Sequence, residues 1–258
     1  LISDNTLRQV GAHFRHNSEL VRLDSEMTAS VEDEKYVRES EKSTVRRHCH
    51  LPPGARVLEA GCGTGGNLAM LSAYGRLEAF EYDADARAAA SAKGIVEARP
   101  GALPDGVDLP DDSFDLIALF DVLEHIEEDR ASLVTLGRKL GPRGRMLVSV
   151  PANPWLWSHH DEVHHHFRRY TKRGLGQVIA DAGLKAETLG YFNTLLFPAA
   201  VAQRMAQRLT GGQSSADTMP PGWLNAILRG VFRTERHLVG RLPLPFGLSL
   251  FAVIGRGE

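Results

Sequence analysis

The stretch from Ala55 to Leu71 constrains the fold of this chain more than any other. Its sequence is Ala-Arg-Val-Leu-Glu-Ala-Gly-Cys-Gly-Thr-Gly-Gly-Asn-Leu-Ala-Met-Leu. An apolar run ends at Glu59, a glycine-rich segment follows, and an apolar helical pattern begins at Leu68. Glycine tolerates positive φ and lets a ligand approach the main chain, and the start of a helix offers N–H groups to a ligand. The stretch therefore predicts a strand, a ligand-binding turn and a helix.

The turn fits more than one ligand. Gly61, Gly63 and Gly66 have the spacing of a dinucleotide-binding fingerprint, which is a weak signal when it stands alone. Glu59 precedes Gly61 by two residues, and a carboxylate there would repel a pyrophosphate but attract a cationic group. A glycine-rich turn that binds nothing is the third interpretation. Glu59 favours a ligand that carries a positive charge.

A second acid ends the next apolar run. Leu77–Glu81 is predicted to be a strand, and Glu81 follows the glycines by about twenty residues, the usual distance of a ribose-binding acid. Its carboxylate can accept hydrogen bonds from both hydroxyls of a ribose. Tyr82 comes next, and its ring could lie against an adenine. Set against an exposed acid of no function, this pattern favours a nucleoside ligand without deciding which one.

The two strongest stretches of the chain together resemble a known family. Val57–Gly65 resembles motif I of the class I S-adenosylmethionine-dependent methyltransferases. The pattern Leu-Pro, Ser-Phe-Asp, Val-Leu-Glu-His within Leu109–Ile126 is similar to the fourth-strand segment of many small-molecule methyltransferases. The resemblance, which covers about Leu51–Gly190 and the last strand, implies an α/β, Rossmann-like class I methyltransferase fold. In that fold a mostly parallel seven-stranded sheet has helices on both faces and an antiparallel last strand.

The resemblance also implies an enzyme that uses S-adenosyl-L-methionine and releases S-adenosyl-L-homocysteine. It implies that Ala102 and Leu103 wall the adenine. Phe120 and Asp121 would flank the methionine end, and His125 would lie under the reaction centre unless it is a helix-capping or core histidine. The full set of predicted cofactor-binding residues is Glu59, Gly61, Cys62, Gly63, Gly65, Glu81, Tyr82, Ala102, Leu103, Phe120, Asp121 and Val122.

The rest of the pattern predicts alternating strands and helices, which imply a mostly parallel sheet between helical layers. Further strands are expected at Ile95–Ala98, Phe114–Phe120, Gly144–Pro151, Leu184–Gly190 and Leu248–Gly255, and helices at Ala84–Lys93, from Asp121 onward and at Arg173–Ala182. Residues 1–50 are predicted to be an N-terminal helical arm, and residues 51–258 a methyltransferase domain. A helical insertion at about 191–246 is expected to contain helices at Leu195–Leu209 and Trp223–Val239 around a flexible Gly211–Pro221.

The loop Asn153–Thr171 follows the fifth predicted strand, where ligands of open α/β sheets bind. A metal site, a polar substrate mouth and a solvated loop with internally paired charges are the three interpretations. The histidine and acid spacings match no standard zinc or facial-triad pattern, so no metal site is predicted. The position at a strand end favours the substrate mouth, with Trp157, Asp161, Arg169 and Tyr170 as substrate residues. Because histidine titrates near neutral pH, the candidate catalytic bases are His125, His160 and His166.

Composition narrows the partners and the compartment. The net charge of −2 gives no global attraction for nucleic acid, and no nucleic-acid partner is expected. Two cysteines, with no signal-peptide pattern and no apolar run of membrane-spanning length, lead us to expect a cytoplasmic protein. The insertion is interpreted as a lid over the acceptor, a homodimer contact, a peripheral membrane contact or helices that simply pack on the core.

The sequence thus predicts in-line transfer of a methyl group from the sulfonium to an oxygen, nitrogen or carbon nucleophile of a small or lipid-linked acceptor. One alternative is an NAD(P)-dependent oxidoreductase, which Glu59 and the lack of a Tyr-x-x-x-Lys pair disfavour. The other is a non-catalytic subunit that binds S-adenosylmethionine and transfers nothing.

Overall fold

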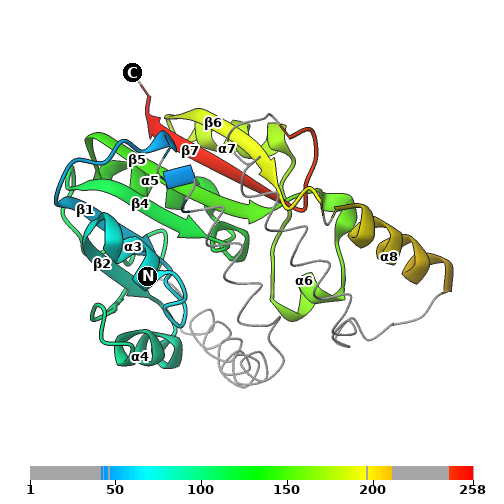
Figure 1. Ribbon diagram of the computed structural model, residues 1–258, viewed down its shortest axis with the longest axis horizontal. Coiled ribbons are helices and arrows are strands. Elements are labelled where there is room, and N and C mark those ends of the chain that lie inside the picture. The colour runs from blue at the N-terminus through cyan, green and yellow to red at the C-terminus, as the bar shows by residue number, and fades with distance from the viewer. Residues whose placement is uncertain (1–41, 43, 46, 196, 211–243, 258) are drawn as a thin grey trace, which may run out of the picture.

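The computed structural model describes residues 42, 44, 45, 47–195, 197–210 and 244–257. Its centre is a seven-stranded sheet in the order β3-β2-β1-β4-β5-β7-β6 (Figure 1). The strands are β1 (Ala55–Ala60), β2 (Gly75–Glu81), β3 (Arg99–Pro100), β4 (Phe114–Phe120), β5 (Leu140–Pro151), β6 (Leu184–Phe192) and β7 (Ser249–Arg256). Strand β7 runs antiparallel to β5 and β6, and the other pairs are parallel. The predicted sheet is therefore confirmed, including its antiparallel last strand.

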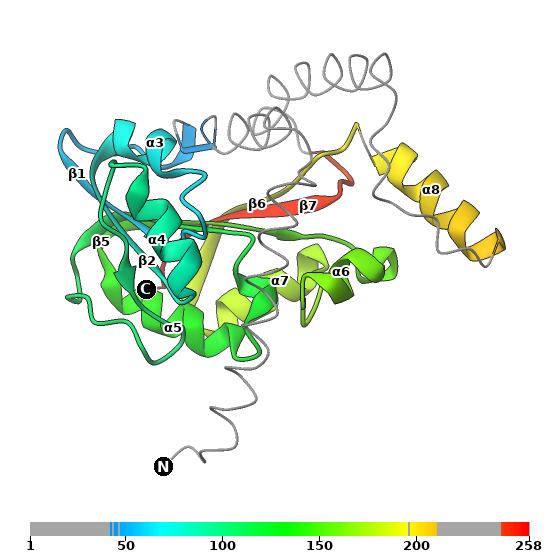
Figure 2. The same ribbon diagram turned by 90° about the horizontal axis from the view of Figure 1, so that it is seen from below.

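Helices cover both faces of the sheet, as predicted. They are α3 (Leu68–Leu71), α4 (Ala84–Ala92), α5 (Asp129–Lys139), α6 (His159–Val163), α7 (Lys172–Asp181) and α8 (Phe197–Thr210), with 3-10 turns η1 (Ser72–Tyr74), η2 (Leu123–His125) and η3 (Pro154–Leu156). Leucines of α5 and the apolar side of α7 pack into one core cluster, whereas α3 contributes to the cluster on the opposite face. Figure 2 shows α3 on one side of the sheet and α5 and α7 on the other.

The central strands form because they are apolar on both faces. In β4, Ile117 and Leu119 face the cluster that contains α5 and α7, and Leu116 and Ala118 face the opposite cluster. All four side chains are fully buried. Burial of one such leucine or isoleucine stabilises the fold by about 1.5–3 kcal/mol. Because both faces of such a strand are covered, only the residues at its end can contact a ligand.

Two predicted elements were placed wrongly. The strand expected at Ile95–Ala98 is instead the two-residue β3, because the Ala98 amide donates to the Ser91 hydroxyl at 3.0 Å rather than to the sheet. The helix expected from Asp121 does not begin there. Asp121 takes a left-handed φ of 50°, a short 3-10 turn follows, and α5 begins at Asp129. The segment between β4 and α5 is thus an irregular turn.

The insertion leaves the sheet at the end of β6. Strands β6 and β7 pair along their length although the insertion separates them in sequence. Helix α8 matches the first predicted insertion helix and projects away from the sheet (Figure 1). The predicted arm up to residue 41, the flexible Gly211–Pro221 and the helix Trp223–Val239 lie outside the described residues. Within the part of the chain that is described, no helix combines the length and the apolar character needed to cross a membrane.

Candidate active site

The glycine turn joins β1 to α3 in the predicted way. Gly61, Gly63 and Gly65 all have positive φ, at 73°, 52° and 81°. The amides of Gly61 and Cys62 both donate to the carbonyl of Phe80 at 3.0 Å, which holds the turn against the end of β2. A Cβ on Gly61 would lie 2.9 Å from the Val122 methyl groups. Glycine is therefore required where the turn meets the segment after β4.

Glu81 organises the neighbouring strand end. Its Oε2 accepts the amide of Gly63 at 2.8 Å, and its Oε1 accepts the amide of Asp83 at 2.9 Å. Each carboxylate oxygen has two lone pairs, so both can accept a second donor such as a ribose hydroxyl. The carboxylate links the glycine turn to the loop after β2. Its contact with a ribose stays a prediction.

The other predicted cofactor-binding acid, Glu59, is buried. Glu59 lies near the end of β1 and is only 2 % exposed, so it presents little surface to a ligand. Cys62 is also buried, and its pKa is raised to about 12 by burial first and then by the charges of Glu59 and Glu81. The Cys62 thiol is protonated at neutral pH and acts through packing.

The predicted adenine wall lies beside Glu81. The amide of Gly101 donates to the Glu81 carbonyl at 3.3 Å, and Ala102 and Gly106 exchange two backbone hydrogen bonds in a tight loop. Ala102 and Leu103 are partly buried there, whereas Tyr82 is 46 % exposed. A Cβ on Gly101 would meet the Phe80 ring at 2.8 Å, so this loop also lies closely against β2.

The residues after β4 lie between the glycine turn and the loop after β5. Phe120 and Val122 are partly buried, and Val122 contacts Gly61 closely, as described above. Asp121 is exposed, and its amide donates to the Ser149 carbonyl at 3.1 Å. A left-handed non-glycine residue costs of order 1–3 kcal/mol and is often found at functional sites. Although the residue is exposed, desolvation by the neighbouring chain raises the pKa of the Asp121 carboxyl, while His166 and a hydrogen bond with Ser149 lower it.

A buried carboxylate organises the loop after β5. Asp161 is fully buried, and its oxygens accept hydrogen bonds from His166 Nδ1 at 3.0 Å, Arg169 Nε at 2.6 Å, and the amide and hydroxyl of Ser158 at 2.8 and 3.0 Å. Burial alone would raise its pKa, but the bonds from His166 and Arg169 bring the pKa well below its usual range. Asp161 is thus an ionised anchor for His166.

Three backbone and side-chain contacts attach this loop to the turn after β4. The amide of Phe167 donates to the Glu124 carbonyl at 2.8 Å. Arg168 donates to the Glu127 carbonyl at 2.8 Å and pairs with Asp129 at 2.7 Å. As a result His125 and His166, which are distant in sequence, stand edge to face with ring centroids 4.6 Å apart.

Two of the three candidate bases are therefore brought together. Desolvation by the neighbouring chain first, and then the charges of His166 and His164, lower the pKa of His125 to about 4 although part of the residue is exposed, so its ring is neutral at physiological pH. His160 belongs to α6, but its side chain lies outside the described part of the structure. Glu124 was not predicted. It is fully buried beside the two rings, and only its position directly before His125 could have drawn attention to it.

Burial corrects part of the predicted substrate mouth. Tyr170 does not face an open cavity: it is 4 % exposed and its hydroxyl donates to Asp129 at 2.8 Å. Asp161 is also too deeply buried to contact a substrate and holds other residues instead. Arg169 spans from Asp161 to the Ala152 carbonyl at 3.3 Å, and Trp157 is partly buried. Trp155 and Phe167 of this loop are exposed aromatic residues.

Known proteins share both the sequence and the architecture. Residues 34–189 match the family model described as a methyltransferase domain. A probable S-adenosylmethionine-dependent methyltransferase from Mycolicibacterium smegmatis is 30% identical over 166 residues, which cover 62% of this chain. The match spans 64% of the length of that relative.

Solved structures agree on the fold. The S-adenosylmethionine-dependent methyltransferase from Mesorhizobium loti superposes with a TM-score of 0.57 at 16% identity over 84% of this chain and 98% of its own. Geranyl diphosphate C-methyltransferase from Streptomyces coelicolor A3(2) gives 0.58 at 14% identity over 84% of this chain and 79% of its own. With the glycine turn, the strand order and the family match in agreement, the chain belongs to the class I S-adenosylmethionine-dependent methyltransferases.

Proposed function

We propose that this chain transfers a methyl group from S-adenosylmethionine to a polar nucleophile, oxygen or nitrogen, of an acceptor that binds against His125 and His166. The observation that carries the proposal is the shared segment after β4. Val122 contacts Gly61 of the cofactor turn, and three residues later His125 contacts His166. A cofactor on the turn and an acceptor at the histidines would therefore be neighbours.

For such a reaction the protein must mainly align the reacting atoms. The sulfonium is already an activated donor, and holding nucleophile, methyl carbon and sulfur in line supplies an effective molarity that can reach about 10⁵ M or more. A hydroxyl or ammonium acceptor must also lose its proton. His125 and His166 are the histidine rings beside the proposed acceptor position. Asp161 fixes the orientation of the His166 ring.

An aromatic cluster beside the loop supports an acceptor with an apolar part. The ring of Phe197, at the start of α8, lies 5.9 Å from the ring of Trp155 and 5.1 Å from the ring of Phe246. Trp155 and Phe246 are both exposed. Exposed aromatic residues in a group are typical of ligand or membrane contacts. We therefore include lipid-linked molecules in the proposed acceptor class.

Labelled S-adenosylmethionine tests the proposal. The full chain is incubated with methyl-labelled cofactor and a cell extract that is then separated into aqueous and lipid fractions. We expect label in one discrete product. The His125→Ala variant should bind the cofactor with unchanged affinity but transfer label at least about tenfold more slowly, since proton removal contributes about 10²-fold or more in typical enzymes. A chain that binds the cofactor and labels nothing would be a non-catalytic binding subunit.

A further inference from the structure

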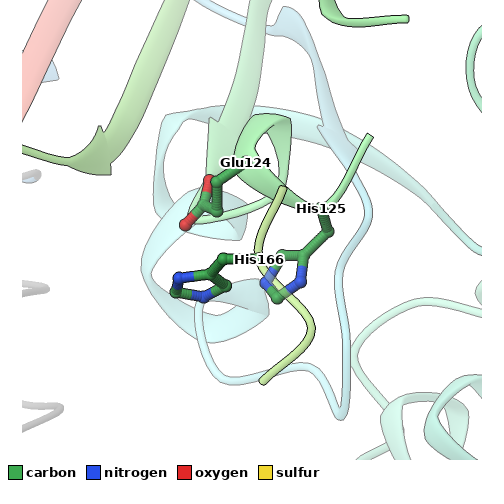
Figure 3. A group of neighbouring side chains, drawn as sticks. All are labelled: Glu124, His125 and His166. Carbon is green, nitrogen blue, oxygen red and sulfur yellow. The ribbon is translucent and has the colours of Figure 1, made fainter. Parts of the chain in front are cut away.

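Three side chains from two distant segments place metal-ligating atoms together. Glu124 and His125 lie on η2 after β4, and His166 lies in the loop after α6. One ligand atom from each of these residues lies within 4.8 Å of the other two. Figure 3 shows the carboxylate of Glu124 and the ring of His125 both directed toward the ring of His166. A carboxylate with two imidazoles is a common ligand set for transition metals.

The carboxylate of Glu124, unpaired within the described part of the chain, is a second, independent observation that points to a ligand at this place. Its side chain is fully buried, and neither carboxylate oxygen has a hydrogen-bond partner among the described residues. About nine in ten buried polar groups in proteins have a partner, and a buried carboxylate without one is costly. The backbone carbonyl of Glu124 is fixed by the Phe167 amide, so the side chain is held beside His166. A cation would provide the missing compensation.

His166 carries the support that a metal-binding histidine usually has. Its Nδ1 lies 3.0 Å from Asp161 Oδ1, and Asp161 is held in turn by Arg169 and Ser158. Metal-ligating histidines commonly donate one ring N–H to a carboxylate, which fixes the tautomer and directs the other nitrogen to the ion. With the proton on Nδ1, the nitrogen that can bind an ion is Nε2, on the opposite side of the ring from Asp161.

We propose that Glu124, His125 and His166 bind a divalent first-row transition-metal ion of the zinc or cobalt type. Zinc bonds to imidazole nitrogen and carboxylate oxygen are about 2.0–2.2 Å long, so ligand atoms on one ion lie within about 4.4 Å of each other. In a tetrahedral site three such ligand atoms lie about 3.3–3.6 Å apart. The three atoms here lie within 4.8 Å of one another, so binding an ion requires side-chain movements of about 1 Å. Two imidazoles favour such ions over magnesium or calcium, which prefer oxygen ligands.

The role of the ion, unlike its binding, rests on the proposed methyl transfer. Three protein ligands leave a coordination position for an acceptor hydroxyl, whose pKa falls when its oxygen binds the ion. The hydroxyl proton goes to solvent. The oxygen then forms a bond to the methyl carbon while the carbon–sulfur bond breaks, and the electron pair of that bond stays on the sulfur of S-adenosylhomocysteine. The acceptor class is thus an alcohol or phenol.

Spacing along the chain could not reveal this site. Glu124 and His125 are adjacent, whereas the third ligand follows only after helix α5, strand β5 and two short helical segments. The contact between the Phe167 amide and the Glu124 carbonyl, which closes the site, is not encoded in any local motif.

Metal titration of the full chain tests the proposal. Protein treated with a chelator and then freed of it is titrated with Zn²⁺ in a calorimeter, and with Co²⁺ while the visible absorption is recorded. We expect one equivalent of each ion to bind. The visible spectrum of the Co²⁺ complex should be that of an ion with nitrogen and oxygen ligands. His125→Ala and Glu124→Gln should weaken binding at least about tenfold, and Asp161→Asn about 10–100-fold, as is typical for a supporting carboxylate.

His159→Ala is the matched control, because this exposed histidine in the same loop pairs with Glu162 and lies outside the proposed site. It should bind zinc like the unmodified chain. His125 is exposed as well, so its replacement decides the question even if changes at the buried Glu124 prevent folding. The proposal is overturned if the unmodified chain binds no ion, or if His159→Ala loses as much affinity as His125→Ala.

The titration contains neither cofactor nor acceptor, so its result is independent of the proposed function. Zinc binding without any methyl transfer would leave the metal site intact and remove the role given to the ion. Methyl transfer that is unchanged by the chelator, in a chain that binds no zinc, would remove the metal site and keep the transferase.

Discussion

The hydroxyl of Tyr170 shows how one buried residue supports the site. It donates to Asp129, which also pairs with Arg168 from the histidine loop. Burial and the charge of Asp129 both raise the pKa of Tyr170, so the hydroxyl remains a donor at all ordinary pH values. Tyr170 thereby helps to fix the base of the loop that carries His166.

We predict that Tyr170→Phe destabilises the protein by about 1.5–3 kcal/mol, the usual contribution of a hydrogen bond to a charged group. The measurement is urea denaturation followed by circular dichroism. Tyr191→Phe is the control, because the Tyr191 hydroxyl has no hydrogen bond within the described ranges, and we expect it to change stability by less than about 0.5 kcal/mol. Equal losses in the two variants would contradict the role given to Tyr170.

The cysteines give a second prediction for single residues. Burial raises the pKa values of Cys49 and Cys62 to about 12, and for Cys62 the charges of Glu59 and Glu81 add to the effect. Because the thiolate is the reactive form, we expect iodoacetamide at pH 8 to modify neither residue in the folded chain and both in urea. Mass spectrometry reads out the labelling. Rapid modification of folded Cys62 would show that its surroundings are more open than described.

Local pattern was enough to predict residues whose partners are close in sequence. The glycines of the first turn and Glu81 follow from strand, turn and acid in succession, and the structure joins Glu81 to Gly63 directly. Glu124 and Asp161 could not be predicted in their roles, because burial defines both and Glu124 also meets a residue that is distant in sequence, His166. A sequence shows that a residue is acidic, but not that four donors surround it.

Among the elements, the glycine turn depends on space as well as on φ. Gly61 and Gly54 have nearly equal φ values of 73° and 70°, but a Cβ would meet Val122 only at Gly61 and open space at Gly54. Both alanine variants carry the left-handed penalty of about 1–2 kcal/mol. Gly61→Ala also forces the turn away from the segment after β4.

We therefore predict that Gly61→Ala weakens S-adenosylmethionine binding at least about tenfold, or about 1.4 kcal/mol, whereas Gly54→Ala leaves the affinity unchanged. Calorimetric titration of the two variants makes the comparison, with thermal melting as a check on folding. If Gly54→Ala weakened binding as much as Gly61→Ala, general strain rather than the contact with Val122 would explain the result.

The same segment explains why one predicted element failed. Asp121-Val-Leu-Glu-His-Ile has a helical apolar pattern, but its backbone groups form hydrogen bonds with another strand and another loop. The amide of Asp121 donates to Ser149 of β5, and the carbonyl of Glu124 accepts from Phe167. Tertiary hydrogen bonds outweighed local propensity at this point. The buried strand directly before it, by contrast, was predicted to the residue, because Phe114–Phe120 is apolar on both faces apart from Asp115.

At the scale of the whole molecule, alternation of elements was sufficient to predict the sheet and its helical layers. The antiparallel last strand followed from the resemblance alone, and the β6–β7 ladder confirms it. What the sequence could not provide was the meeting of the loop after β5 with the turn after β4. That meeting depends on Phe167 and Arg168, which reach Glu124 and Glu127 across the fold.

A calorimetric titration of S-adenosylmethionine into the full chain tests the central claim most directly. The cofactor should bind at one site, and Glu81→Gln should weaken it at least about tenfold, since the charged acceptor at the end of β2 is lost. Glu78→Gln, on the same strand and paired with Arg56 at 2.9 Å, should bind like the unmodified chain. A chain that binds no S-adenosylmethionine, or binds it equally well without the Glu81 charge, would contradict this account.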